Sequence, residues 1–208
     1  MSADLTFARV GALIEASTLN NPYASPNAPL TPACHGGYFA VARRKFAIML
    51  IITGGTYATY WCYRQWKAYT QVNGGNQWAW ARGLFWWLFA YNLFAKLDAE
   101  LQERGQSIEW SHRRRGLVVL TAASGSLLLS LLNPVYALLP QVLLTLLSAF
   151  MLIGTLPAVN ALANDLNGEG NSRLTWANWI WLLVGILMWI IAVGGVALML
   201  AFPDTAAG

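Results

Sequence analysis

The chain has 208 residues, of which 57% are hydrophobic and 11% are charged, against about 25% charged residues in ordinary soluble domains. This length is sufficient for one helical bundle but not for a bundle plus a sizeable soluble domain. The net charge of +4 does not indicate nucleic-acid binding, because the basic residues form short clusters beside hydrophobic runs, where lipid head groups explain them.

The first 37 residues are predicted to form a flexible, proline-rich cytoplasmic head. Residues 21–29 are typical of an extended linker, and a docking peptide for a partner is the alternative. The first membrane crossing is predicted near residues 46–63, directly after three consecutive basic residues.

A second crossing is predicted near residues 78–96, although Arg82 lies near one end and the uncharged stretch is short. Such a segment can also be re-entrant or interfacial. A crossing is favoured because Trp78 and Lys96 can anchor the two ends at the membrane surfaces.

Residues 116–164 form a run of 49 residues without Asp, Glu, Lys or Arg. A hydrocarbon core is crossed by roughly 20 apolar residues. The run therefore predicts two crossings, 116–133 and 140–163, joined by a turn over residues 133–140.

A second charge-free run, residues 174–203, predicts a crossing near 176–202 followed by a short tail, 204–208. The expected fold class is therefore an all-α integral membrane protein. It comprises a bundle of about five transmembrane helices over residues 38–203 and the flexible N-terminal head.

The Lys and Arg residues predict the orientation of this bundle. With five crossings and the N-terminus inside, the inner segments hold ten basic residues and the outer segments hold three, namely Arg64, Lys67 and Arg82. This bias places the N-terminus in the cytoplasm and the C-terminus outside.

Small residues at helical spacing are predicted to let neighbouring helices approach closely, because helices in a bilayer associate through close packing. The candidate packing residues are Gly54, Ala58, Ala122, Ser126, Ser130, Gly154, Ala158, Gly185, Ala192 and Gly195.

Fourteen of the 27 aromatic residues fall between Tyr57 and Phe94, and most fit a belt of rings at head-group depth. Trp86, Trp87 and Trp189 are expected nearer the middle of the membrane. Together with Phe85 and Asn92, they are the candidate residues facing a partner protein or an apolar ligand.

The basic clusters are candidate contacts for anionic lipid head groups. They comprise Arg43, Arg44, Lys45, Arg113, Arg114 and Arg115. The sequence indicates no cofactor, no metal ligand and no catalytic set.

Asp165 begins a loop that resembles a calcium site, but Trp176 stands where the bidentate acid is required, so a polar turn is favoured. The two histidines, His35 and His112, have no partner arrangement of a known catalytic type.

Two stretches carry a family resemblance. Residues 37–46 read Gly-Tyr-Phe-Ala-Val-Ala-Arg-Arg-Lys-Phe, and residues 53–67 read Thr-Gly-Gly-Thr-Tyr-Ala-Thr-Tyr-Trp-Cys-Tyr-Arg-Gln-Trp-Lys. With residues 81–85, 157–164 and 171–179, they resemble small bacterial inner-membrane proteins of unknown function, apart from Cys62, where that pattern has an aromatic residue. The resemblance implies a location in the bacterial inner membrane and a multi-pass architecture, and it supplies no activity.

The favoured functional hypothesis is a non-enzymatic accessory protein that packs against another membrane protein or complex. It depends on the scarcity of charged groups within the predicted crossings. A carrier or binder of a lipid or other apolar molecule is the alternative. A lipid-modifying enzyme that uses Asp165, Glu169, His112 and the arginines is the third.

Overall fold

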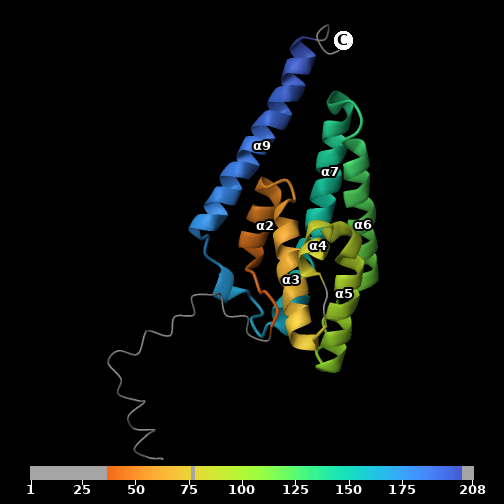
Figure 1. Cartoon of the computed structure of the whole chain (residues 1–208), viewed down its shortest axis with the longest axis vertical. Helices are drawn as coiled ribbons and strands as arrows, with labels where there is room; N and C mark the ends of the chain where they lie inside the picture. The colour runs from red at the N-terminus through yellow and green to blue at the C-terminus, as the bar shows by residue number, and fades with distance from the viewer. Residues whose placement is uncertain (1–36, 76–77, 203–208) are drawn as a thin grey trace, which may run out of the picture. The chain divides into compact units, whose positions relative to one another are not determined.

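The computed structural model describes residues 37–75 and 78–202. Within these ranges all regular structure is helical, which confirms the all-α fold class (Figure 1). The predicted head up to residue 36 and the tail from residue 203 lie outside the described residues. The helices are α2 Arg43–Ile52, α3 Tyr57–Asn73, α4 Ala79–Leu84, α5 Trp86–Glu103, α6 His112–Leu129, α7 Pro134–Ile153, α8 Leu156–Leu162, the short 3₁₀ helix η1 Glu169–Asn171, and α9 Trp176–Ala201.

The segment 46–63 forms a helical hairpin instead of the single helix that the sequence predicted. The chain reverses at Gly54 and Gly55, whose φ angles of +56° and +86° are accessible mainly to glycine. The Phe46 ring lies 6.0 Å from the Tyr57 ring and 5.1 Å from the Trp61 ring, so α2 and α3 run antiparallel. We call this pair of helices the first hairpin and residues 53–56 its tip.

The segment 78–96 also reverses direction, and it forms a second hairpin of α4 and α5 with its tip at Phe85. Gly83 of α4 packs against Tyr63 of α3, where an added Cβ would lie 2.9 Å from the Tyr63 Cα. Further along α5, Lys96 donates a hydrogen bond to the Tyr69 hydroxyl at 3.0 Å. Helix α4 therefore runs along α3 in the opposite direction, and α5 runs back along α3 in the same direction as α3.

Helices α6 and α7 form the long antiparallel pair that the 49-residue uncharged run predicted (Figure 1). Helix α7 begins at Pro134. The sequence predicted a turn over residues 133–140 and a helix only from residue 140. Asn133 is its N-cap, and its side-chain oxygen accepts from the Val135 amide at 2.9 Å. A proline at the first helical position has no amide hydrogen to satisfy, which is why the helix can begin there.

Two helical segments are long and apolar enough to cross a membrane: Pro134–Leu162, which comprises α7 and α8, and α9. In α9, only 11% of the most apolar stretch is buried within the protein. A core helix of a soluble protein would be mostly buried, so this degree of exposure distinguishes α9 from such a helix.

The core lies at the base of the first hairpin, where an extended segment, residues 38–41, is buried between helices. The Gln65 side chain accepts from the Phe39 amide at 3.2 Å and donates to the Phe39 carbonyl at 2.8 Å. The Asn160 side chain makes the same two-point contact with the backbone of Val41, at 3.2 Å in both directions. Buried backbone groups must be paired. The side-chain amides of Gln65 and Asn160 supply the hydrogen bonds that an adjacent β-strand would otherwise provide to this extended segment.

Candidate functional site

The tip of the first hairpin reaches the middle of the long helices. A Cβ added to Gly185, near the centre of α9, would lie 2.8 Å from the Thr53 Cα. A Cβ added to Gly55 would lie 3.5 Å from Thr145 Cγ2, near the centre of α7. The tip is therefore held between α7 and α9 at about half their length.

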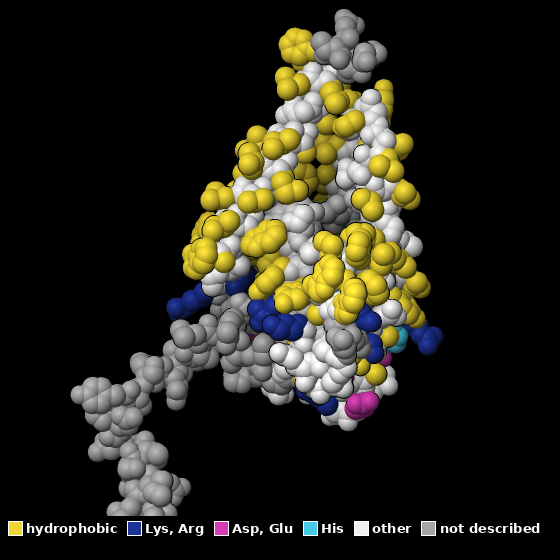
Figure 2. Space-filling model, in the orientation of Figure 1, with side chains coloured by type: hydrophobic (Ala, Val, Ile, Leu, Met, Phe, Trp, Pro, Cys, Tyr) yellow, Lys and Arg dark blue, Asp and Glu magenta, His cyan; other side chains and the backbone are white. Residues whose placement is uncertain are grey.

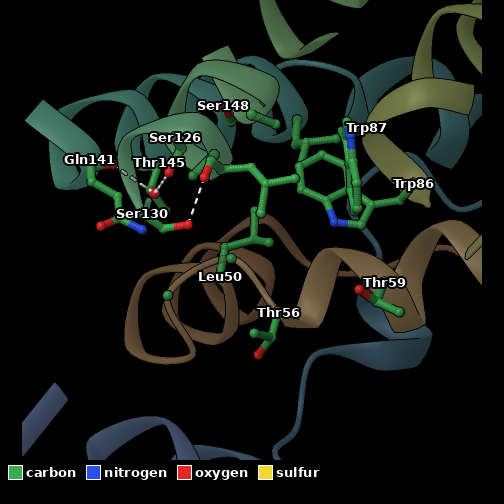
Figure 3. A pocket seen from close by; sticks show the side chains of 16 residues that line it. Leu50, Thr56, Thr59, Trp86, Trp87, Ser126, Ser130, Gln141, Thr145 and Ser148 are labelled. Carbon is green, nitrogen blue, oxygen red and sulfur yellow. Dashed lines mark hydrogen bonds between the residues drawn. The ribbon is translucent and has the colours of Figure 1, made fainter. Parts of the chain in front are cut away.

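A cavity of about 310 Å³ lies beside this tip, and we call it the tip pocket (Figure 3). Both hairpins contribute to it, together with α6 and α7. Its lining residues are Leu50, Gly54, Gly55, Thr56, Thr59, Trp86, Trp87, Ala123, Ser126, Leu127, Ser130, Gln141, Thr145, Ser148, Ala149 and Leu152.

One end of the tip pocket is aromatic. Trp86 and Trp87 begin α5, and their rings stand nearly perpendicular, at 87° with centroids 6.3 Å apart. Figure 3 shows both indoles on the side of the pocket opposite Ser130 and Gln141. They reach the pocket because the α4–α5 tip directs the start of α5 towards the tip of the first hairpin.

The other end of the tip pocket is formed by hydroxyl groups of α6 and α7. Ser126 and Thr145 lie with their hydroxyl oxygens 3.3 Å apart and connect the two helices. Gln141, Thr145 and Ser148 share one face of α7, since residues four and three apart lie above one another on a helix. The wall is therefore polar, yet no charged residue is among those that line the pocket.

The predicted ligand-facing residues are distributed over four places. Trp86 and Trp87 line the tip pocket. Trp189 lines a neighbouring cavity of about 160 Å³ on the other side of the tip, and its indole donates to the Ile51 carbonyl at 3.4 Å. Phe85 is 44% exposed and packs edge-on to Trp87.

Asn92, the fifth of these residues, lies in a polar cavity of about 360 Å³ near the base of the bundle. There Glu100 accepts from the Tyr38 hydroxyl and pairs with Arg104. Burial, and then the hydrogen bond to Glu100, raises the pKa of Tyr38, so that its hydroxyl keeps its proton. The structure thus separates Asn92 from the two tryptophans.

The basic residues proposed to contact lipid head groups have different environments. Arg43, Arg44, Arg113 and Arg114 are exposed. Lys45 is buried, and its ammonium donates to Asn171 Oδ1 at 2.6 Å and to the Arg173 carbonyl at 2.7 Å. Burial lowers the pKa of Lys45.

Arg115 is half-buried and donates to the carbonyl of Met151, in the last turn of α7, at 3.4 Å. Three further basic side chains lie over aromatic rings: Arg64 over Phe39 at 4.2 Å, Arg82 over Trp66 at 4.3 Å and Lys96 over Tyr69 at 4.6 Å.

The predicted packing residues have several roles. Ala58, Ala122, Ala158 and Gly185 are buried between helices. Ser126 and Ser130 line the tip pocket, as does Gly54, which lies in the turn. Gly154 faces the Arg115 guanidinium, Ala192 lines the smaller cavity beside Trp189, and nothing lies within 4 Å of a Cβ added to Gly195.

The residues considered for an enzyme have partners of their own. Asp165 accepts from the backbone amides of Glu169 and Gly170 at 2.9 and 3.0 Å. His112 lies 3.0 Å from an oxygen of Asp98. Between residues 37 and 202, leaving out 76–77, no group of three His, Cys, Asp or Glu side chains is placed to hold a metal ion.

Sequence reasoning did not identify the tip pocket, although the spacing of Gln141, Thr145 and Ser148 on α7 is a signal for a polar helix face. The tip itself was signalled by the Gly-Gly pair at 54–55, which is typical of a turn. Comparisons with protein-family models, with curated proteins and with solved structures found no match for this chain.

Proposed function

We propose that this chain is a bacterial inner-membrane protein that takes up a lipid or other apolar molecule from the bilayer and holds it, without transforming it, in the tip pocket. The observation that carries the proposal is the pocket itself. It has a volume of about 310 Å³, two indoles at one end and hydroxyl groups at the other. Ligand sites begin at about this volume and combine apolar walls with a few polar groups.

In this proposal three helical segments cross the membrane. Two are the candidate spans, α7 with α8 and α9. The third is α6, which runs antiparallel to α7 and whose three arginines lie in its first turn, at the inner surface. The two hairpins enter from the inner surface and return to it. This arrangement replaces the five crossings expected from the sequence. Two hairpins in place of two crossings leave the orientation unchanged, with the N-terminus in the cytoplasm and the C-terminus outside. Irregular backbone at membrane depth is tolerated where protein surrounds it, as at the tip of the first hairpin.

The distribution of basic residues supports this orientation. In Figure 2, Lys and Arg gather around the part of the bundle that holds the hairpin bases, and the far ends of α6, α7 and α9 show none. Arg64, Lys67 and Arg82, which five crossings put outside, belong to α3 and α4. With re-entrant hairpins all three join the inner group, so that the positive-inside bias becomes complete for the described residues.

A cysteine-labelling experiment, with one accessible cysteine in each variant, tests this topology. Lys67→Cys, in a Cys34→Ser background that retains the fully buried Cys62, should react with a membrane-impermeant maleimide only in inside-out vesicles. Gln102→Cys is the inner control and Leu132→Cys the outer control. Labelling of position 67 from the outside would indicate that residues 46–63 cross the membrane, and would contradict the re-entrant hairpin.

Co-purification tests the binding function. We expect the protein, extracted from native membranes into polymer nanodiscs, to carry a defined lipid-like molecule detectable by mass spectrometry. Trp86→Ala with Trp87→Ala should remove it. Trp78→Ala with Trp80→Ala is the matched control, since that pair is exposed and lines no part of the tip pocket. Loss of ligand from both double variants, or from neither, would contradict the proposal.

A second candidate function is the accessory role, and the exposed part of α9 favours it. A Cβ added to Gly194 or Gly195 meets nothing within 4 Å, so a second helix could approach the α9 backbone there. If a membrane protein co-purifies, Gly195→Leu should release it. Val193→Leu, on another face of α9, should not.

The proposed role is non-enzymatic, and two acidic residues of the loop before α9 test this part. Asp165→Asn with Glu169→Gln should leave ligand content unchanged, because neither residue lines the tip pocket. A ligand that accumulates in this double variant as an unreacted precursor of the molecule found in the wild type would indicate an enzyme.

A further inference from the structure

The hydroxyl groups at the polar end of the tip pocket use their own hydrogens within the protein. Ser130 donates to the Leu127 carbonyl at 2.6 Å, Ser148 to the Leu144 carbonyl at 3.0 Å, and Thr145 to the Gln141 carbonyl at 2.9 Å. Since a hydroxyl has a single hydrogen, Thr145 is the acceptor in its 3.3 Å contact with Ser126, and Ser126 is the donor.

The polar end of the pocket therefore presents mainly hydrogen-bond acceptors to a ligand. Ser126, Ser130 and Ser148 have each placed their hydrogen on a protein oxygen and keep the capacity to accept. The Gln141 side-chain amide adds a carbonyl oxygen together with N–H donors. A ligand that brings a hydrogen-bond donor fits this wall better than one that brings only acceptors.

The charge of the ligand is limited by the same residues. The pocket is lined without Asp, Glu, Lys, Arg or His, and it lies beside the middle of α7, which we place at half the depth of the membrane. A charged group there would be buried without a counter-ion, which is unfavourable by about 2.5 kcal/mol or more. The ligand that fits is uncharged.

The ligand has a route from the bilayer into the pocket. Leu127 of α6 and Ser130, the residue that ends this helix, line the pocket and are themselves exposed, so the pocket opens at its polar end. The volume of about 310 Å³ accommodates the hydroxyl-bearing end of a lipid together with the apolar segment next to it.

From these observations, and on the basis of the proposed function, we infer that the ligand is an uncharged lipid alcohol, whose hydroxyl donates to Ser126 or Ser130. Its apolar body lies against Trp86 and Trp87. Ethers and esters of the same alcohol lack the donor and fit less well, and fatty acids and phospholipid head groups are excluded by their charge.

Photoaffinity labelling in nanodiscs tests this inference with three probes that share one diazirine-bearing alkyl chain: a long-chain alcohol, its methyl ether and the corresponding fatty acid. We expect saturable labelling of α5 and α6 peptides by the alcohol at about fivefold lower concentration than by the ether, as one hydrogen bond of about 1 kcal/mol predicts. The fatty acid should label least. Equal labelling by alcohol and ether would overturn the inference while leaving the proposed function intact, and absence of saturable labelling by all three would overturn both.

Matched serine variants locate the effect. Ser126→Ala with Ser130→Ala should bring alcohol labelling down to the level of the ether, without changing ether labelling. Ser124→Ala, on the same helix and outside the pocket lining, should preserve the preference for alcohol. Unchanged preference in the Ser126 and Ser130 double variant would contradict the assignment of the hydroxyl to this wall.

Discussion

Gly185 of α9 packs directly against Thr53 at the tip of the first hairpin, so closely that a methyl group at position 185 would lie 2.8 Å from the Thr53 Cα. Backbone lies on the other side of this contact, and backbone cannot move aside as a flexible side chain can. The absence of a side chain at position 185 is therefore what lets α9 reach the hairpin.

Gly185→Ala tests this contact. Alanine is preferred over glycine in a helix by about 1 kcal/mol, but overpacking against backbone costs about 1–3 kcal/mol. We expect a lower midpoint of thermal unfolding in detergent. Gly195→Ala in the same helix is the control, because its Cβ meets nothing within 4 Å. It should leave the midpoint unchanged or raise it, and an equal effect of the two substitutions would contradict the contact.

The left-handed turn at the tip makes a separate prediction. Gly55→Ala places a side chain at φ +86°, which costs about 1–2 kcal/mol in a position that only glycine adopts readily. We expect reduced stability in thermal unfolding and loss of bound ligand, since Gly55 lines the tip pocket. Gly194→Ala, at an unstrained position in α9, should do neither.

The amide of Gln65 satisfies both backbone groups of Phe39, and its removal should be costly. Gln65→Leu leaves a buried N–H and a buried carbonyl without partners, at about 1–3 kcal/mol for each unsatisfied group. We expect a lower free energy of unfolding in a denaturant titration. Gln71→Leu on the exposed part of α3 is the control. If Gln65→Leu unfolds like the wild type, water or another side chain must satisfy Phe39.

The raised pKa of Tyr38 makes stability depend on pH in the alkaline range. An unfolded tyrosine loses its proton near pH 10, whereas folded Tyr38 keeps it. The folded state then binds more protons than the unfolded state, so this contribution is fully present below pH 10 and is lost above it. The stability advantage of the wild type over Tyr38→Phe should therefore shrink above pH 10, by up to about 1.4 kcal/mol per pH unit. A difference that stays constant from pH 8 to 11 would contradict a protonated Tyr38.

The candidate site was only partly predictable. Trp86 and Trp87 were identified because indoles in the middle of an apolar run are unusual, and both line the tip pocket. Asn92 was grouped with them because it is close in sequence. It lies six residues beyond Trp86 on a helix that runs towards the base, and it lines a different cavity.

The sequence by itself determined that the chain is helical and where its apolar segments lie, because charge-free runs and turn residues are local properties of the chain. It also indicated helices in the regions of α6, α7 and α9, since these are long charge-free runs that need no neighbour to define them. The predicted turn over 133–140 instead falls largely within α7, and the break between α7 and α8 was not predicted. Only the tertiary structure decided that residues 46–63 and 78–96 reverse direction. A hairpin and a crossing can have the same hydrophobicity, and the difference lies in contacts such as Phe46 with Trp61 and Gly83 with Tyr63. The tip pocket follows from those reversals, because they bring the indoles of α5 opposite the hydroxyl groups of α6 and α7.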